Sequence, residues 1–347
     1  MPSAAPPKKS PERRSRRTTG SVTLADVAKV AGVSSITASR ALNTPDRVSA
    51  ATLQSVLEAV ERTGYVPNML AGGLASSRSK LVAALVPTIA GPVFLETIQA
   101  LTESLAESGY QLMLGQSGYT GAREDALLAA IIGRRPDGIV LTGILHSSAG
   151  RRRLLGAGIP VVETWDLTPT PIDMLVGFSH ERVGKTVAEY LHAQGRRKFA
   201  MVTADDHRAG LRRKAFTETA KELGIAEVHC CVVPAPTTLG SGRAGLSNLL
   251  ARHPDIDAVF CSSDMLALGV LTEARSHNIS VPRQLAVFGF GDLGFAGDTD
   301  PALTTVRIDG TMIGRQAARF IVDRAEGREI AQRVVDIGFS IIKRGSA

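Results

Sequence analysis

Residues Gly289 to Gly294 read GFGDLG, a Gly-x-Gly-x-x-Gly pattern of the kind that lets a backbone loop approach a dinucleotide phosphate. In dinucleotide-binding proteins this pattern opens a helix and comes early in its α/β unit. Here Asp298, Asp300 and Pro301 follow closely, and proline interrupts a helix. We therefore expect no dinucleotide at this loop.

Other residue types that support catalysis or metal binding lack the required spacing. The three cysteines are Cys230, Cys231 and Cys261. They form no Cys-x-x-Cys pair or zinc-type pattern, so we expect small apolar side chains in buried strands. The sequence has no P-loop, nucleophile elbow or His–Glu metal motif, and His180, His207 and His253 are scattered over predicted loops without a special role. The sequence predicts a binding protein with no cofactor and no metal, rather than an enzyme.

Positive charge is concentrated in the first quarter of the chain. Residues 1–80 contain 12 Lys and Arg against 5 Asp and Glu, whereas the other 267 residues contain 28 of each. A basic end on a neutral body indicates contact with a polyanion. The basic residues 1–20 are poor in apolar side chains, which predicts a disordered tail.

Hydropathy predicts no membrane partner. The sequence has no run of 18 apolar residues, and its basic start lacks the apolar stretch of a secretory signal. We therefore expect a cytoplasmic protein.

Two short helices are predicted directly after the tail. Thr23 can cap the first helix, with Asp26 three residues later as in a capping box, and Gly32 ends it. Ser34 can cap a second helix that continues to Leu42. Small residues between the two helices allow them to cross closely, which is typical of a helix-turn-helix.

A third helix, capped by Ser49 and ended by Gly64, would complete a small domain. Its inward side chains are expected to be Leu53, Val56, Leu57 and Val60. In a helix-turn-helix the second helix enters the DNA major groove. Its outer face carries Ser35, Ile36, Ser39 and Arg40. Arginine can bind guanine with two hydrogen bonds, and an apolar side chain can contact a thymine methyl group, so the pattern predicts DNA binding. A simple helical hairpin is the alternative.

From Leu81 onward, predicted strands and helices alternate in two series. The strands are LVAALVP, YQLMLGQ, GIVLTG and PVVET in the first series, and KFAMVTA, EVHCCVV, DAVFCSS and LAVFGF in the second. Helices are expected near residues 93–108, 122–133, 208–223, 241–252 and 264–277. This alternation predicts two doubly wound parallel-sheet subdomains. Because ligands bind at the carboxyl ends of such strands, the strand ends should line a cleft.

The segments at the predicted strand ends are therefore candidates for ligand binding. They are residues 87–94, 163–166, 208–213, 262–264 and 289–292. Two side chains among them allow two interpretations each. Trp165 could stack on a sugar or belong to the core, and Asp264 could cap the following helix or bind ligand hydroxyls.

Two stretches of the chain resemble the lactose-repressor/galactose-repressor (LacI) family almost position by position. They are TLADVAKVAGVSSITASRALN, residues 23–43, and VSAATLQSVLEAVERTGYVPNMLAGGLAS, residues 48–76. The resemblance extends over residues 21–345 and implies a homodimer that binds a palindromic operator in double-stranded DNA. It also implies a hinge helix that orders only on DNA, from which Leu74 enters the minor groove and kinks a base step. Gly72 and Gly73 weaken such a helix in the free protein.

The resemblance also implies the domain limits and the residues that contact DNA. The expected parts are a tail 1–20, a helix-turn-helix domain 21–66, a hinge 67–80 and a two-lobed body 81–347 of the fold seen in periplasmic binding proteins. Lobe one would comprise 81–178 and 310–331, and lobe two 179–308 and 332–347. The implied DNA-contacting residues are Thr23, Ser34, Ser35, Ile36, Thr37, Ser39, Arg40, Asn43, Asn68, Leu74 and Ala75.

Within that family the body is similar to the gluconate-utilisation repressors, through VVETWDL, IDMLVGFSHERVG and LTTVRIDG. Many members have Gly-Tyr-Asp where this chain has Gly289-Phe290-Gly291, so a carboxylate common in the family is missing. A sugar acid needs a cation, and HRAGLRRK at 207–214 supplies several. The implied effector-binding residues are Phe94, Glu163, Trp165, Asp166, Arg208, Arg212, Ser263, Asp264 and Asp292.

These features predict a repressor of sugar-acid catabolism genes that a small sugar acid such as gluconate releases from its operator. Another sugar, a ketogluconate or a phosphorylated sugar acid is the alternative effector. The body also resembles periplasmic sugar-binding proteins, which makes a solute-binding protein a distant alternative. The DNA-binding end and the missing signal peptide count against it.

Overall fold

The computed structural model describes residues 22–66, 78–118, 121–145 and 147–347. The chain divides into two compact units, residues 1–79 and residues 80–347. The predicted hinge residues 67–77 and the tail 1–20 lie outside the described residues.

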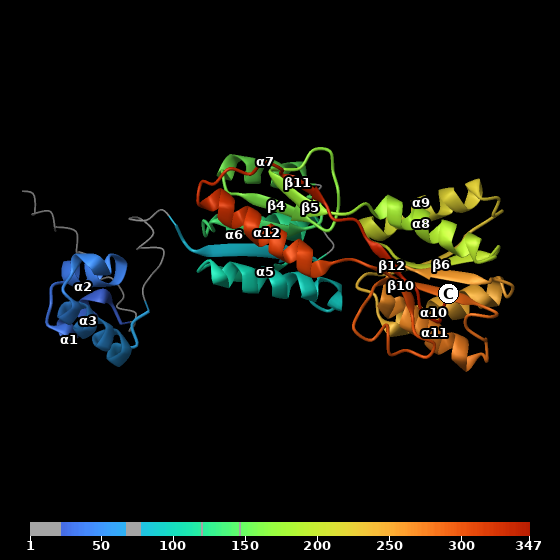
Figure 1. Cartoon of the computed structure of the whole chain (residues 1–347), viewed down its shortest axis with the longest axis horizontal. Coiled ribbons are helices and arrows are strands. Elements are labelled where there is room, and N and C mark those ends of the chain that lie inside the picture. Colours follow the sequence, from blue (N-terminus) through green and yellow to red (C-terminus); the bar gives the residue numbers. More distant parts are fainter. Residues whose placement is uncertain (1–21, 67–77, 119–120, 146) are drawn as a thin grey trace, which may run out of the picture. The chain divides into compact units, whose positions relative to one another are not determined.

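The first unit contains the three predicted helices (Figure 1). They are α1 (Leu24–Ala31), α2 (Ser35–Asn43) and α3 (Ala50–Thr63), with a 3-10 turn η1 (Pro45–Arg47). The capping box at Thr23 is present, because its side chain accepts from the Asp26 N–H and the Asp26 carboxylate accepts from the Thr23 N–H at 2.8 Å. Gly32 ends α1 at φ 68°, in the left-handed region that favours glycine.

Small side chains form the core of this unit. Its fully buried members are Val27, Ala28, Ala38, Ala41, Val56 and Ala59. The prediction that Leu57 points inward was wrong, since it is 44% exposed. Ala59 occupies the buried position on α3 instead, because close crossing of the helices leaves room for a methyl group only.

The first lobe of the second unit is a six-stranded sheet in the order β11-β5-β4-β3-β1-β2, and every pair in it is parallel. Its strands are β1 (Leu81–Val86), β2 (Gln111–Gln116), β3 (Gly138–Thr142), β4 (Val161–Thr164), β5 (Met174–Gly177) and β11 (Val334–Asp336). The helices are α5 (Leu95–Glu107), preceded by the turn η2 (Pro92–Phe94), α6 (Gly121–Ile132), α7 (Ser148–Ala157) and α12 (Gly310–Ala325). Alternate residues of β1 join two different apolar clusters, one with α5 and α12 and one with α6 and α7, so helices cover both faces. Figure 1 shows α12 lying beside α5.

The second lobe repeats this plan with the order β12-β10-β9-β8-β6-β7. Its strands are β6 (Phe199–Ala204), β7 (His229–Val233), β8 (Ala258–Cys261), β9 (Ala286–Gly291), β10 (Thr304–Arg307) and β12 (Ser340–Ile342). Its helices are α8 (His180–Ala193), α9 (His207–Glu222), α10 (Leu239–Arg252) and α11 (Asp264–Ser276). Only β12 is antiparallel among the strand pairs of the described residues. The predicted fold class, a helical domain plus two doubly wound subdomains, is confirmed.

The chain crosses between the lobes three times, after β5, after β10 and after β11. The predicted lobe limit after residue 331 was wrong. Residues 334–336 form β11, which pairs in parallel with β5 and so belongs to lobe one. This strand has three residues at a sheet edge and only its central residue is half-buried, so it leaves no hydrophobic run in the sequence.

Two cysteines depart from the prediction that all three are buried. Cys261 is buried in the central strand β8, but Cys230 is exposed and Cys231 half-buried. Both lie on β7, which is an edge strand of its sheet and is therefore covered less completely. Among the described residues, no helix is long and apolar enough to cross a membrane.

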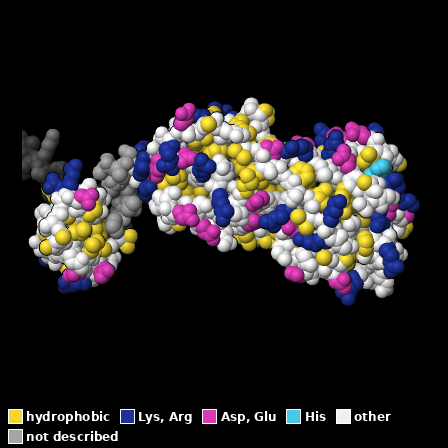
Figure 2. Space-filling view, viewed as in Figure 1, with side chains coloured by type: hydrophobic (Ala, Val, Ile, Leu, Met, Phe, Trp, Pro, Cys, Tyr) yellow, Lys and Arg dark blue, Asp and Glu magenta, His cyan; other side chains and the backbone are white. Residues whose placement is uncertain are grey.

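On the face of the second unit seen in Figure 2, basic and acidic side chains are interspersed. This mixture agrees with the balanced charge of residues 81–347.

Candidate DNA-binding surface and effector cleft

The outer face of α2 presents the side chains that were predicted to reach DNA bases. Ile36 is 66% exposed, and Ser35 and Arg40 are exposed beside it. A large apolar side chain that is mostly exposed suits contact with a base methyl group. The arginine on the same face can reach a guanine edge.

Most of the other residues predicted to contact DNA, where the structure describes them, form hydrogen bonds at the ends of α1 and α2. Ser34 caps α2 by accepting from the Thr37 N–H at 3.1 Å, and Thr23 caps α1. The Asn43 amide donates to the Ser39 carbonyl at 2.9 Å. Such caps fix α2 with its N-terminal turn exposed, which is the end that a recognition helix inserts. Asn68, Leu74 and Ala75 lie outside the described residues, so their predicted role is untested.

In the second unit, a cleft lies between the two lobes at the carboxyl ends of strands from both sheets. The cleft is lined by Thr88, Phe94, Trp165, His180, Asp206, Arg208, Arg212, Thr237, Ser262, Ser263 and Phe290, together with small and apolar residues. Of the predicted effector residues, Phe94, Trp165, Arg208, Arg212 and Ser263 line it. Glu163, Asp166, Asp264 and Asp292 are not among the lining residues.

Arg212, on α9, is the most constrained cation of the cleft. It is buried, its Nη1 lies 2.8 Å from His180 Nδ1, and its Nη2 donates to the Ser262 carbonyl at 3.1 Å. Its guanidinium carbon lies 4.0 Å from the centre of the Phe290 ring. Burial lowers the pKa of Arg212 to about 10, so the group is charged at neutral pH. Its Nε has no hydrogen-bond partner among the described residues.

His180 is the first residue of α8 and is almost completely buried beside Arg212. Burial, and then the charges of Arg212 and Arg208, hold the pKa of this imidazole well below its ordinary value. Its Nε2 lies 2.9 Å from the Trp165 carbonyl oxygen. His180 is therefore neutral at physiological pH and its ring is held at both nitrogens.

Arg208 lies one turn before Arg212 on α9 and is less buried. Its guanidinium carbon lies 5.1 Å from the centre of the Phe94 ring, and its Nη1 donates to the Thr142 carbonyl at 3.4 Å. It thus extends from lobe two toward lobe one. Asp206, the only acidic residue among those described around the cleft, caps α9 by accepting from the Ala209 N–H at 3.0 Å.

Trp165 belongs to the core, since it is only 3% exposed, and it also lines the cleft, so stacking on a ligand stays a prediction. Its ring meets Phe94 edge-on at 5.1 Å and Phe178 at 5.9 Å. The indole N–H donates to Thr97 Oγ1 at 3.0 Å. Its backbone is left-handed, at φ 67°, which is rare for a bulky residue.

Two of the acids outside the lining stabilise backbone of lobe one. Glu163 accepts from the Ile172 N–H at 2.8 Å and from the Leu145 N–H at 3.3 Å. Asp166 accepts from the Leu167 N–H at 2.8 Å. Burial raises the pKa of both carboxyl groups despite these bonds.

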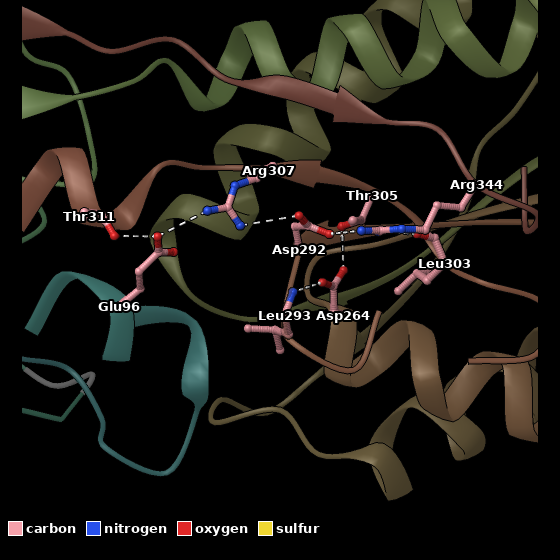
Figure 3. A network of polar contacts seen from close by, with 9 residues as sticks. All are labelled: Glu96, Asp264, Asp292, Leu293, Leu303, Thr305, Arg307, Thr311 and Arg344. Atoms are coloured by element: carbon pink, nitrogen blue, oxygen red, sulfur yellow. Dashed lines mark hydrogen bonds and ion pairs between the residues drawn. The ribbon is translucent and has the colours of Figure 1, made fainter. Parts of the chain in front are cut away.

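The other two acids belong to a polar network that Figure 3 shows at the ends of β9 and β10. Asp264 accepts from Thr305 Oγ1 at 2.6 Å and from the Leu293 N–H at 2.7 Å, and burial raises its pKa to about 6. Asp292 pairs with Arg344 at 2.7 Å and with Arg307 at 3.4 Å.

The same network ties the lobes together. Arg307 also pairs with Glu96 of lobe one at 3.2 Å, and the Thr311 hydroxyl donates to Glu96 at 2.8 Å. Because these carboxylates are occupied by protein donors, they bind the lobes and the strand ends rather than facing the cleft.

Several lining residues were not predicted from the sequence. His180, Asp206 and Thr237 line the cleft outside the predicted strand-end segments, and His180 had been placed in a loop without a role. Ser262 and Phe290 also line it and lie within the predicted segments 262–264 and 289–292. The strand MLVG, residues 174–177, ends just before His180. Applying the strand-end rule to that strand would have found this histidine.

Comparisons with known proteins agree with both units. Residues 23–68 match the model described as bacterial regulatory proteins, lacI family, and residues 188–347 match the periplasmic binding protein-like domain. The HTH-type transcriptional regulator GntR of Pseudomonas aeruginosa is 37% identical over 96% of this chain and 98% of its own length. The regulator of the same name from Escherichia coli K12 is 28% identical over 93% of this chain and 98% of its own length.

Solved structures extend this likeness to three dimensions. The crystal structure of a LacI-family transcriptional regulator from Silicibacter pomeroyi is 33% identical, with a TM-score of 0.88 over 94% of this chain and 99% of that chain. These relatives are transcriptional regulators that carry a DNA-binding unit. The similarity therefore favours a regulator over the solute-binding and enzymatic alternatives.

Proposed function

The chain belongs to the lacI family of bacterial regulatory proteins, and we propose that it is a repressor that a sugar acid such as gluconate releases from its operator. It is a DNA-binding transcriptional regulator. The repressing role, the effector and the operator are the parts that we propose.

We propose that the protein is cytoplasmic and that two copies of the chain bind a palindromic operator as a homodimer. A twofold dimer presents the same helix to two half-sites, and a symmetric site matches it. Arg40 and Ile36 on the exposed face of α2 would contact the bases, and Leu74 in the hinge would contact the minor groove.

The observation that carries the choice of an acidic effector is the state of Arg212. This guanidinium is charged, almost completely buried, and keeps an Nε without a partner among the described residues. Arg212 forms no contact ion pair among the described residues, and Asp206 and Asp166 act on its charge only at longer range. A carboxylate bound directly beside this buried cation would offset more of its desolvation cost. A neutral sugar would offer it dipoles only.

The remaining polar groups of the cleft suit the hydroxyls of such an acid. Thr88, Thr237, Ser262 and Ser263 bring hydroxyl groups to the lining. Hydroxyls can both donate and accept, so they can serve a polyol chain without adding negative charge near a bound carboxylate. Arg208, beside Phe94, would be the second cation for the acidic group.

Release from DNA would follow from differential affinity. A ligand shifts an equilibrium only as far as it prefers one state, so gluconate should bind the free dimer more tightly than the operator-bound dimer. The named relatives are regulators called GntR, which supports an effector of the gluconate class. A ketogluconate, a phosphorylated sugar acid or another sugar is the alternative.

Calorimetric titration of the full chain tests the ligand class. The panel comprises gluconate, 2-ketogluconate, 6-phosphogluconate, glucose and sorbitol. Gluconate should bind at least about tenfold more tightly than glucose or sorbitol, since a charge-assisted hydrogen bond contributes about 1.5–3 kcal/mol. Equal affinity for the acid and the neutral compounds would refute the acidic effector. Tighter binding of another acid would correct the ligand and keep its class.

A matched pair of variants on α9 tests the site itself. Arg208→Ala should weaken gluconate binding about tenfold or more. Arg213→Ala removes a similar charge from the same helix but outside the cleft lining, and should leave the affinity within about twofold. Equal effects of the two variants would mean that general charge, not the cleft, attracts the acid.

A further inference from the structure

Four buried side chains form a continuous hydrogen-bonded chain from lobe one to the cation of the cleft. The members of this buried chain are Thr97, Trp165, His180 and Arg212, each at most 4% exposed. The links are Trp165 Nε1 to Thr97 Oγ1 at 3.0 Å, His180 Nε2 to the Trp165 carbonyl at 2.9 Å, and Arg212 Nη1 to His180 Nδ1 at 2.8 Å. They come from α5, the end of β4, α8 and α9.

Chemistry fixes the direction of each link. A carbonyl oxygen can only accept, so His180 Nε2 must carry the proton that it donates to Trp165. In a neutral imidazole the other nitrogen is then an acceptor, and an arginine can only donate. His180 Nδ1 therefore accepts from Arg212, and protonation of that nitrogen would break the link and place two cations in contact.

This arrangement fixes Arg212 before a ligand enters. Its two terminal nitrogens bond to His180 and to the Ser262 carbonyl, and its guanidinium carbon lies 4.0 Å from the centre of the Phe290 ring. The cleft-lining side chain keeps its Nε–H unpaired among the described residues. A cation held in place loses less conformational entropy on binding, so preorganisation adds affinity.

Trp165 and Thr97 hold the far end of the buried chain. The Trp165 backbone is left-handed, which costs energy for a bulky residue and persists where the surroundings hold it. The indole is fixed by Thr97 and by edge contacts with Phe94 and Phe178, and this in turn fixes the carbonyl that accepts from His180. The indole N–H is already bonded to protein, so the tryptophan acts through its backbone carbonyl.

We propose that His180, with Trp165 and Thr97 behind it, is a positioning residue for the acidic group of the effector, because it holds the guanidinium of Arg212 in place at the lining of the cleft. This inference rests on the proposed function and extends it. It assigns recognition of the acid to a histidine that does not itself need to touch the ligand, and it makes a threonine on α5 part of the specificity.

The test measures gluconate affinity of full-length variants by calorimetry. His180→Leu removes the acceptor, and His180→Asn supplies an amide oxygen that can replace Nδ1. His180→Leu should lose about tenfold or more in affinity, and His180→Asn should keep it within about threefold. A purely structural histidine would not be rescued by the smaller polar side chain.

A second set of variants tests the far end of the buried chain. Thr97→Val removes the acceptor of the indole N–H with little change in shape, and should weaken gluconate binding by about threefold. Combined with His180→Leu it should cause no further loss, because both act through Arg212. Thr102→Val is the matched control, since Thr102 lies on the same helix and bonds only its own turn at Ile98. It should leave the affinity unchanged.

Nitrogen-15 NMR of the wild-type histidines gives a readout that needs no ligand. The inference expects the Nε2–H tautomer of His180 at neutral pH. A protonated ring or the Nδ1–H tautomer would overturn it, as would unchanged gluconate affinity in His180→Leu or full additivity of the double variant. If the wild-type protein binds none of the three sugar acids, the proposed function fails and the inference fails with it. Binding by wild type without sensitivity to His180 refutes the inference alone.

Discussion

Asp264→Asn tests whether burial raises the pKa of this carboxyl group in the folded protein. Asp264 is fully buried, and burial raises its pKa from 3.8 to about 6. Because the pKa is higher in the folded than in the unfolded chain, the folded state binds the proton more tightly. The resulting stabilisation is complete below the unfolded pKa and is lost as the pH rises through the folded pKa. Each pKa unit corresponds to about 1.4 kcal/mol, so the loss is about 3 kcal/mol.

The assay is urea unfolding at fixed protein concentration between about pH 4 and about pH 7. The chain has a single tryptophan, Trp165, so its fluorescence reports the unfolding of the second unit. Glu163 and Asp166 also have raised pKa values and contribute the same sign of pH dependence to both proteins. Only the difference between wild type and Asp264→Asn is therefore assigned to Asp264.

The amide of Asp264→Asn can accept from the Leu293 N–H and donate to the Thr305 hydroxyl, so the local bonds can persist without a charge. The stability of the variant relative to wild type should rise by about 2 kcal/mol from about pH 4 to about pH 7, since part of the full effect lies below about pH 4. Asp255→Asn, at an exposed carboxylate whose pKa is lowered first by its bond to Lys198, should show no such rise. A difference that does not change with pH would refute the reasoning, because it would mean that Asp264 ionises normally inside the fold.

Three further substitutions test other parts of the account. Arg40→Ala should reduce discrimination between operator and random DNA by about 1–3 kcal/mol in gel-shift titrations, and an equal loss on both DNAs would mean that Arg40 contacts no base. Leu74→Ala should reduce operator bending in a circular-permutation gel assay while calorimetry finds unchanged gluconate affinity; unchanged bending would make the hinge a simple linker. Gly184→Ala should destabilise the second unit by about 1–3 kcal/mol in urea unfolding, because the new Cβ would lie 2.3 Å from the Arg212 carbonyl oxygen and force α8 away from α9. Gly156→Ala, on an open face of α7, should not destabilise it, and equal behaviour of the two would exclude close helix packing as the cause.

The fold could be predicted from the sequence where local signals were strong. Capping residues such as Thr23 and Ser34, followed by helical spacing of small apolar residues, indicated the first unit. Continuous apolar strands that alternate with helices indicated the two sheets. The exceptions depend on tertiary position. Strand β11 joins its sheet through backbone pairing with β5 and packs only one side chain, Val335, against the core, and Cys230 is exposed because β7 has a neighbour on one side only.

The candidate site was predicted less completely, because strand-end position does not determine where a side chain points. Trp165 and Arg212 line the cleft as expected, but Glu163 turns to backbone N–H groups of its own lobe. Asp292 pairs with Arg344, which lies more than fifty residues further along the chain. A local sequence pattern does not predict a partner so far away in the chain. The position of His180 after a strand end could have been read from the sequence, but its role could not, because that role comes from a contact with Arg212 on a different helix.

Operator binding in the presence of gluconate tests the central claim most directly. Fluorescence anisotropy gives the affinity of the full-length protein for labelled operator with and without saturating gluconate, and calorimetry gives gluconate affinity with and without operator. The account predicts that gluconate weakens operator binding by about five- to 150-fold and that operator weakens gluconate binding by the same factor. An operator affinity that gluconate leaves unchanged, or that glucose lowers equally, would contradict a repressor controlled by a sugar acid.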